Sequence, residues 1–215
     1  MNTPDRDTKT KLLEAAARIF AEKGYEEATL REICDAAGAN SAAINYHFGE
    51  KRRLYVEAIR QVAGTCSVVD SLSSWTPHTT PSEKLLDFIR TLLGRMLDPH
   101  NADLRHRLMM RVMAQPTEGT ADFVREFIRP DFELLLNILE ELAPSRLTSA
   151  RKQLLAFSVV GQCAHFRVAC GLVALLTPPE EFASYTVENL AHHICNFTLS
   201  ALGTQSLSDY QNPNT

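Results

Sequence analysis

Apolar residues recur at helical spacing through most of this chain. The first such stretch predicts an amphipathic helix from about residue 8 to residue 23, which Gly24 ends because glycine readily adopts the left-handed conformation found at helix C-termini. Its apolar positions follow the spacing i, i+3, i+4, i+7 and are Leu13, Ala16, Ala17 and Phe20. Because no segment shows the sustained alternation of β-branched residues that marks strands, we predict an all-α fold.

Two short helices are predicted directly after the first. Thr29 and Glu32 have the spacing of a capping box, which predicts the start of a second helix. Gly38 permits a sharp turn, and Ser41 is the predicted N-cap of a third helix that Gly49 ends. The predicted inward-facing residues of these two helices are Leu30, Ile33, Cys34, Ala37, Ile44 and Phe48.

A stretch rich in serine, threonine and proline, residues 66–81, separates two predicted domains. The N-terminal domain spans residues 6–66 and closes with a fourth helix from residue 51. The C-terminal domain spans residues 82–203, where threonine caps followed by proline and glutamate mark two helix starts. Its predicted helices are 82–97, 102–114, 120–143 with a break at Pro130, 149–176 and 180–202. The polar tail, 204–215, is predicted to be disordered.

Composition describes an ordinary globular protein and gives no sign of a strongly basic domain. Of the 215 residues, 45% are hydrophobic and 22% are charged, and the formal net charge is −4. Residues 1–60 carry equal numbers of acidic and basic side chains, so a DNA-binding surface would have to be a local patch.

The chain carries no recognisable targeting or membrane signal, so we expect a cytoplasmic protein. Its first eleven residues are mostly charged or polar, unlike a secretory or lipidation signal. The apolar stretch 154–176 is long enough for a bilayer, but it contains Gln162, His165 and Arg167 near its middle. We therefore interpret it as a helix inside a protein bundle or dimer and expect no membrane partner.

Cysteine and histidine usage favours neither disulfides nor a cofactor. The five cysteines are an odd number without a CxxC pair, so reduced thiols are expected, and redox sensing by Cys163 or Cys170 stays open. His192, His193 and Cys195 suggest a metal hypothesis, but adjacent histidines point to different faces of a helix and no carboxylate has matching spacing. We predict no metal and no cofactor.

Residues 29–54 have the pattern of a helix-turn-helix, in which the second helix enters the DNA major groove. Small side chains at Ala42 and Ala43 allow close approach to base edges, and Asn45 can bond an adenine bidentately. Tyr46 and His47 suit phosphate or groove-edge contacts. The predicted DNA-binding residues are Thr29, Arg31, Ser41, Ala42, Ala43, Asn45, Tyr46, His47 and Lys51, with Arg52 and Arg53 adding charge. On spacing alone, a scaffold hairpin explains the segment equally well.

The same segment closely resembles the tetracycline-repressor (TetR) family of regulators. The matching residues are Thr29, Ile33, Ala37, Gly38, Tyr46, His47, Phe48, Lys51 and Leu54. The resemblance implies that Thr29, Tyr46, His47 and Lys51 contact the DNA backbone, while Ser41 to Ala43 and Asn45 read bases. Two departures matter, because Ala39 and Asn40 replace a hydrophobic residue followed by serine or threonine, and Asn45 stands where the family usually has tyrosine.

From about residue 82 the chain resembles the ligand-binding and dimerisation domain of that family, and the run 158–171 resembles its CecR-like subgroup. The resemblance implies a homodimer through the last two long helices. Small residues suited to close helix approach are Gly161, Ala164, Val168 and Gly171, and apolar positions on the final helix are Leu190, Ile194, Phe197 and 199–202. Candidate effector-binding residues are Met96, Met113, Phe123, Phe127, Gln162, His165, Phe166 and Arg167, together with Phe88, Leu92 and Met109. Ordinary core packing also explains most of them.

These patterns predict a ligand-responsive regulator, most simply a repressor that binds palindromic operator DNA as a dimer and is released by a small, largely apolar or aromatic effector. An enzyme is not expected, because the motifs GxSxG, HExxH, GxGxxG and GxxxxGK[ST] are absent. A transcriptional activator of the same family and a helical interaction module without DNA binding remain as alternatives.

Overall fold

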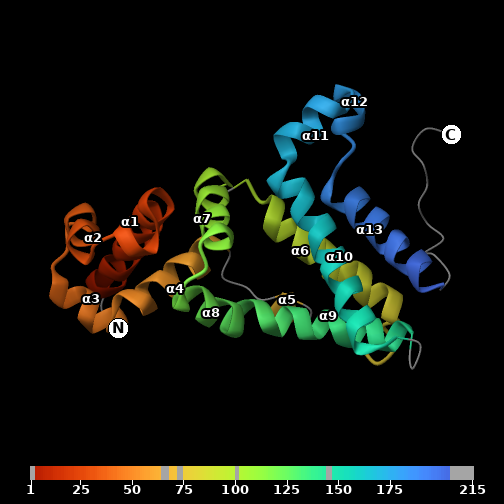
Figure 1. Ribbon diagram of the computed structural model, residues 1–215, viewed down its shortest axis with the longest axis horizontal. Helices are drawn as coiled ribbons and strands as arrows, with labels where there is room; N and C mark the ends of the chain where they lie inside the picture. The colour runs from red at the N-terminus through yellow and green to blue at the C-terminus, as the bar shows by residue number, and fades with distance from the viewer. Residues whose placement is uncertain (1–2, 64–67, 72–74, 100–101, 144–146, 204–215) are drawn as a thin grey trace. The chain divides into compact units, whose positions relative to one another are not determined.

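The computed structural model describes residues 3–63, 68–71, 75–99, 102–143 and 147–203 (Figure 1). Across these ranges every regular element is a helix and none is a strand, which confirms the predicted all-α fold. The chain divides into two compact units, residues 1–65 with 99–129 and residues 66–98 with 130–215. The predicted tail, 204–215, lies outside the described residues.

The first unit is built from the four N-terminal helices and a later segment of the chain. Its elements are α1 (Thr3–Glu27), α2 (Leu30–Ala37), α3 (Ser41–Phe48), α4 (Lys51–Ala63), α7 (Ala102–Ala114), α8 (Glu118–Phe123) and the π-helical turn η1 (Val124–Ile128). Gly24, predicted to end the first helix, has a φ of 83° and a ψ of 177° and interrupts α1, which then continues to Glu27. Phe20, Ile33, Ile44 and Leu54 are fully buried in one core cluster, so the predicted inward faces are confirmed.

Residues 102–128, which the sequence pattern places in the C-terminal domain, pack within the first unit. The Nε of Arg105 donates to the carbonyl of Val62 near the end of α4 at 2.9 Å, and Arg111 donates to the carbonyl of Glu22 at 2.7 Å. Leu108 and Val112 are buried in the same core cluster as α1 and α4. Sequence periodicity cannot reveal this arrangement, because it shows that α7 has an apolar face but not which helix covers that face.

Helix α8 packs tightly against α4 at Gly119. A Cβ atom added there would lie 2.7 Å from Cδ1 of Tyr55, a ring that is buried in the core. We therefore expect Gly119→Ala to lower the free energy of unfolding by about 1–3 kcal/mol through overpacking. The matched control is Gly94→Ala on α6, where a Cβ meets open space and better helix propensity should add about 0.5–1 kcal/mol. Urea denaturation measures both, and a neutral Gly119→Ala would contradict the tight contact.

The break predicted near Pro130 is present as a π-helical turn. In η1 the N–H of Arg129 bonds to the carbonyl of Val124, five residues earlier instead of four. Proline has no N–H and its ring crowds the preceding turn, which accounts for a wider turn immediately before it. The helical run therefore continues from α8 through η1 into α9 with altered geometry and no intervening loop.

The second unit contains the remaining helices around a separate core. They are α5 (Val68–Ser71), α6 (Pro81–Leu97), α9 (Arg129–Leu142), α10 (Ser149–Val168), α11 (Cys170–Leu176), α12 (Pro179–Phe182) and α13 (Val187–Leu202). Phe88 and Leu139 are among the buried residues of its core cluster. The buried carboxylate of Asp131 accepts from the N–H of Val68 at 2.9 Å and pairs with Arg95 at 3.1 Å, so this buried charge is compensated.

Two helices predicted in this unit are each divided. The predicted helix 149–176 breaks at Ala169, and α10 and α11 bend by 78° there. The predicted helix 180–202 stops after α12, and Thr186 caps α13 by accepting from the N–H of Asn189 at 3.2 Å. Two residues in the sequence are consistent with these divisions. Gly171 is a weak helix former just after the first break, and Thr186 is a good N-cap residue just before α13.

No single described helix is both long and apolar enough to cross a membrane. Helices α10 and α11 meet those criteria of length and composition only as a pair, across their bend.

Candidate nucleic-acid interface

Local backbone chemistry sets the angle between α2 and α3. Gly38 adopts the left-handed conformation, with φ 62° and ψ 34°, and thereby ends α2. Asn40 then caps α3, since its side-chain oxygen accepts from the N–H of Ala43 at 3.0 Å. The expected cap, Ser41, is instead the first residue of the helix. The observed cap thus lies one residue before the predicted one, and asparagine and serine are both good capping residues.

Helix α3 buries one side and exposes the other. Ile44 and Phe48 are buried in the first core cluster and anchor the helix. The opposite side, called here the recognition face, consists of the exposed residues Ser41, Ala42, Asn45 and Tyr46. Tyr46 is 77% exposed, although aromatic side chains are usually well covered. Ala43, also predicted to read bases, is half-buried against the core.

Thr29 is held in a polar network at the start of α2. Its side chain accepts from the N–H of Glu32 at 3.2 Å and donates to the Glu32 carboxylate at 2.9 Å, which confirms the capping box. Lys23 on α1 also bonds that carboxylate. These bonds, first the one from Lys23 and then those from Thr29, lower the pKa of Glu32 to about 2. The carboxylate therefore stays ionised at neutral pH, and its contribution to stability is lost only as pH falls from the unfolded-state value of about 4.5 toward 2.

Lys51 lies at the first turn of α4, beside the end of α3. Its Nζ lies 4.6 Å from the centre of the Tyr25 ring and donates to the carbonyl of Glu26 at 3.3 Å. His47 is half-buried and stacks edge-on against Tyr46, with ring centroids 5.0 Å apart. His47 therefore contacts the recognition face, and Lys51 ties the start of α4 to the end of α1. The DNA-backbone contacts that the resemblance implies for both residues stay a prediction.

The three arginines near the recognition face form different ion pairs. Arg31 is exposed on α2, with its Nε 4.0 Å from Asp35. Arg52 lies 3.1 Å from Asp122 on α8, and Arg53 lies 2.7 Å from Glu126 on η1. Carboxylates on α8 and η1 thus pair with both guanidinium groups, and any contact of Arg52 or Arg53 with DNA would compete with these ion pairs. Only the tertiary contact between α4 and these segments shows this.

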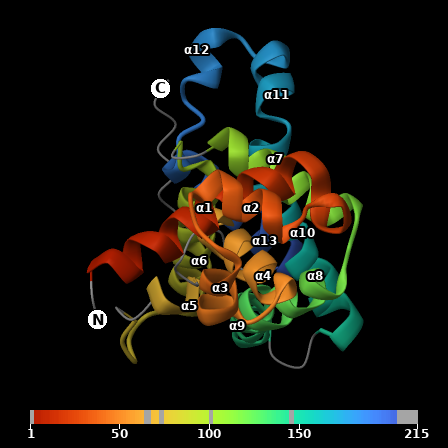
Figure 2. The ribbon, with the colours of Figure 1, turned by 90° about the vertical axis from the view of Figure 1, so that its left-hand side faces the viewer.

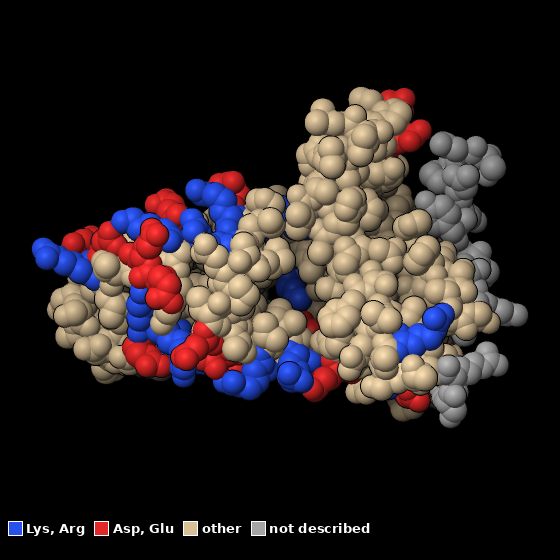
Figure 3. Space-filling model, in the orientation of Figure 1, with Lys and Arg blue, Asp and Glu red and all other residues tan. Residues whose placement is uncertain are grey.

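On the face shown in Figure 3, basic and acidic side chains alternate over the first unit instead of forming one basic field. This agrees with the equal numbers of both charges in residues 1–60. Positive charge near the motif is thus local, as predicted.

Two short helices joined by a left-handed glycine turn, the second exposing a small, polar and aromatic face, define a helix-turn-helix DNA-binding module. The model of the bacterial regulatory proteins of the tetR family matches residues 12–58. The model of the C-terminal domain of the HTH-type transcriptional dual regulator CecR matches residues 81–202. This protein therefore belongs to the TetR family of transcription regulators and carries a CecR-type C-terminal domain.

Curated relatives match only part of this chain. The HTH-type transcriptional repressor AcnR of Corynebacterium efficiens is 42% identical over 97 residues, 45% of each chain. The dual regulator CecR of Shigella flexneri is 35% identical over 85 residues, 40% of this chain and 35% of that protein. The chain thus aligns with less than half the length of either relative.

Solved structures match over nearly the whole chain at lower identity. A putative fatty acid metabolism regulator of Clostridium perfringens has a TM-score of 0.61 at 18% identity, covering 92% of this chain and 99% of that one. FadR of Bacillus subtilis, solved with stearoyl-CoA, has a TM-score of 0.60 at 17% identity, covering 89% and 97%. At this identity the likeness shows the shared fold.

The predicted effector residues fall in both units. In the first unit, Phe123 is buried and its ring lies 5.7 Å from that of the half-buried Phe127. Arg60 lies over the Phe127 ring, and Met113 is 57% exposed. Phe123 and Phe127 are therefore packing residues of the first core.

Met109 packs against the first core as well, and the other seven predicted effector residues lie in the second unit, where Phe88 and Leu92 are buried in the core. Met96 and Phe166 pack against the second core cluster, Gln162 and Arg167 are half-buried, and His165 is exposed. Gln162 donates to the carbonyl of Ser158 at 3.3 Å. Within this unit, α6 and α10 thus carry the candidate residues that face or border the core.

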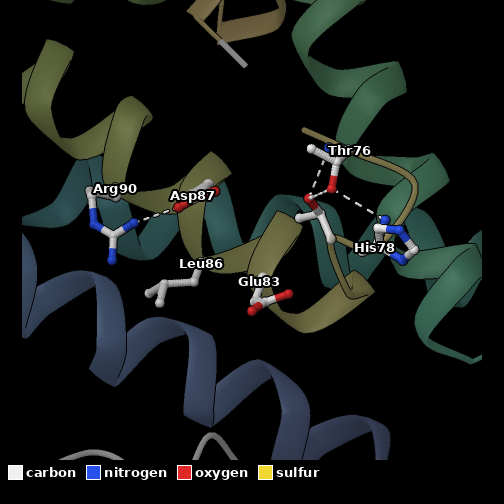
Figure 4. Close-up of a pocket in the computed structure, with 7 residues that line it drawn as sticks. Thr76, His78, Glu83, Leu86, Asp87 and Arg90 are labelled. Atoms are coloured by element: carbon white, nitrogen blue, oxygen red, sulfur yellow. Dashed lines mark hydrogen bonds and ion pairs between the residues drawn. The ribbon is translucent and has the colours of Figure 1, made fainter. Parts of the chain in front are cut away.

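A pocket of about 520 Å³ opens on the second unit beside the start of α6 (Figure 4). Its lining residues are Thr76, His78, Thr79, Glu83, Leu86, Asp87 and Arg90. Within it the Glu83 carboxylate accepts from the N–H of Thr80, the N-cap of α6, and Asp87 pairs with Arg90. The lining is mostly polar and shares no residue with the predicted effector set, so it does not have the chemistry expected for an apolar effector.

The cysteines differ in accessibility. Burial raises the pKa of Cys163 to about 12, which disfavours the thiolate needed for redox chemistry, whereas Cys170 is exposed. Among the residues considered for a metal, Cys195 is buried and His192 lies 2.9 Å from Glu188. Within the described ranges, no three His, Cys, Asp or Glu side chains are placed to share a metal ion.

Proposed function

We propose that this protein is a repressor that binds palindromic operator DNA as a homodimer and is released by a small, largely apolar or aromatic effector. The observation that carries DNA binding is the recognition face of α3. Tyr46 and Asn45 project from a helix that Ile44 and Phe48 anchor in the core. Both side chains are exposed and are therefore free to meet base edges and phosphates.

An apolar surface on α10 and α13 supports the homodimer. Leu154 is 66% exposed and Phe197 is 58% exposed, and Phe157 and Val168 are also exposed. On α10 these residues and Gly161 follow a spacing of three, four and seven residues, which places them along one side of the helix. A Cβ at Gly161 would meet no atom within 4 Å, so a second helix can approach closely there. We call Leu154, Phe157, Gly161, Val168 and Phe197 the dimer face.

The apolar residues expected to form this seam on α13 are mostly turned inward. Leu190, Ile194 and Leu199 are buried in the core cluster of their own unit, and Phe197 is the large apolar side chain that α13 exposes. The assignment of the buried residues to the dimer seam therefore needs correction. Helix α13 packs along α6, and that packing uses its main apolar side.

For the effector, we propose a site in the second unit bordered by Met96 on α6 and by Gln162, His165, Phe166 and Arg167 on α10. Half-buried apolar groups beside a few polar ones are the usual lining of a ligand site. The stearoyl-CoA bound to the Bacillus subtilis fold neighbour has a long apolar chain, which fits this class of ligand. Met113, Phe123 and Phe127 lie in the first unit, and we assign them no role in binding the effector.

The relative AcnR favours repression, since it is named as a repressor. CecR is named as a dual regulator, so activation at some promoters is a second candidate. Both modes use the same recognition face and differ in where the operator lies.

Selection from a random duplex library tests DNA binding, with fluorescence anisotropy on the enriched site at two salt concentrations. We expect a palindrome whose affinity falls as salt rises. Asn45→Ala should relax base preference at one position of each half-site by about 10-fold, because it removes a base-edge contact and no core contact.

The control for this experiment is Asn137→Ala, which removes an exposed asparagine from α9 of the second unit and should keep the wild-type preference. If no sequence is enriched and both variants bind DNA like the wild type, the motif is a scaffold hairpin. We would then prefer the alternative of a helical interaction module without DNA binding.

A further inference from the structure

Helices α11 and α12 form a hairpin that stands away from α6, α10 and α13 in both Figure 1 and Figure 2. The hairpin has its own internal packing. Tyr185 contacts the ring of Phe182, with centroids 6.1 Å apart, and that of Phe166 on α10, with centroids 6.0 Å apart. Val173 is the buried residue of α11. The hairpin is therefore held in place by packing contacts and has a defined outer surface.

That outer surface is unusually apolar. Leu172, Leu175 and Leu176 are 58%, 86% and 75% exposed. No charged residue occurs from 168 to 179, and the space-filling view shows acidic side chains only at the tip of the hairpin (Figure 3). A surface that stays in water normally carries charge, and clustered exposed leucines mark a contact site.

We propose that the α11–α12 hairpin is an arm that packs against a second copy of this chain. The inference rests on the homodimer of the proposed function and extends its contact surface beyond α10 and α13. Continuity supports a second copy as the occupant, because the dimer face ends at Val168 and the exposed leucines begin four residues later.

Symmetry indicates where the arm would dock. In a two-fold dimer the same patch is used on both copies. Gly161 lies seven residues from both Leu154 and Val168. A two-fold axis that passes across α10 at this glycine makes the two α10 helices antiparallel and brings the C-terminal end of one to the N-terminal end of the other. The leucines of the arm would then reach the exposed Leu154 and Phe157 of the second copy, which are apolar in the same way.

Sedimentation velocity over a concentration series tests the proposal on the full chain. We expect the double variant Leu175→Ser/Leu176→Ser to weaken dimerisation by about 100-fold, because each copy loses two leucines that the dimer contact would cover. Neither side chain has core contacts to lose, so circular dichroism should match the wild type, and the single variant Leu175→Ser should show a smaller shift in the same direction. The control is Met113→Ser, which removes a side chain of similar exposure from the first unit and should leave the dimer unchanged.

The possible outcomes distinguish a failure of the proposed arm contact from a failure of the proposed homodimer. If the double variant dimerises as tightly as the wild type, the arm makes no contact with the second copy, while the homodimer stands. If the wild type is monomeric at every concentration, the dimer of the proposed function fails, and the arm fails with it. Flotation with phosphatidylglycerol vesicles supplies the remaining outcome, since binding by the wild type and not by a still dimeric double variant would assign the leucines to a lipid surface and overturn the proposal.

Discussion

Replacing Tyr46 with alanine should weaken binding to the selected operator by about 100-fold. The Tyr46 side chain is 77% exposed on the recognition face, so its loss removes a DNA contact and almost no packing. A contact worth about 1–1.5 kcal/mol, made once by each subunit, accounts for this factor. Fluorescence anisotropy at fixed salt measures the change, and thermal unfolding should show a nearly unchanged midpoint.

Met113→Ala provides a control for this prediction, since it removes a side chain that is 57% exposed on α7 of the first unit. Its operator affinity should equal that of the wild type. If Tyr46→Ala also binds normally, α3 is not the helix that meets DNA. An equal loss for specific and random duplexes would instead assign Tyr46 to the phosphate backbone, as the family resemblance implies.

Placing two charges on the dimer face should separate the subunits. In Leu154→Glu/Phe197→Glu, each copy would have to bury two carboxylates without partners, which should raise the dimer dissociation constant at least about 1000-fold. Operator affinity should fall with it, because a monomer can hold only one half-site at a time. Sedimentation velocity and anisotropy on full and half operators measure both effects.

Met110→Glu is the control for this double variant, because it adds a carboxylate at an exposed apolar position of α7 in the first unit. It should remain dimeric and bind the full operator normally. A dimer that survives the double variant would move the interface away from α10 and α13. Loss of operator binding by a variant that is still dimeric would show that the charges act on the recognition helices instead.

Local signals were sufficient for the helix-turn-helix. The Thr29 capping box, the left-handed Gly38 and the buried pair Ile44 and Phe48 all follow from spacing within one or two helical turns. The misplaced cap at Ser41 shows the limit of such signals, since neighbouring polar residues compete for one position and Asn40 takes it.

By itself, therefore, the sequence determined the helical class, the turn that presents α3 and the family to which the chain belongs, because these depend on residues close together in the chain. The tertiary structure decided which apolar and charged groups remain available. It paired Arg52 with Asp122, turned Ile194 into the core and left Phe197 and Leu175 exposed. Periodicity shows that a helix has an apolar side, but only packing between distant segments determines whether that side is already covered.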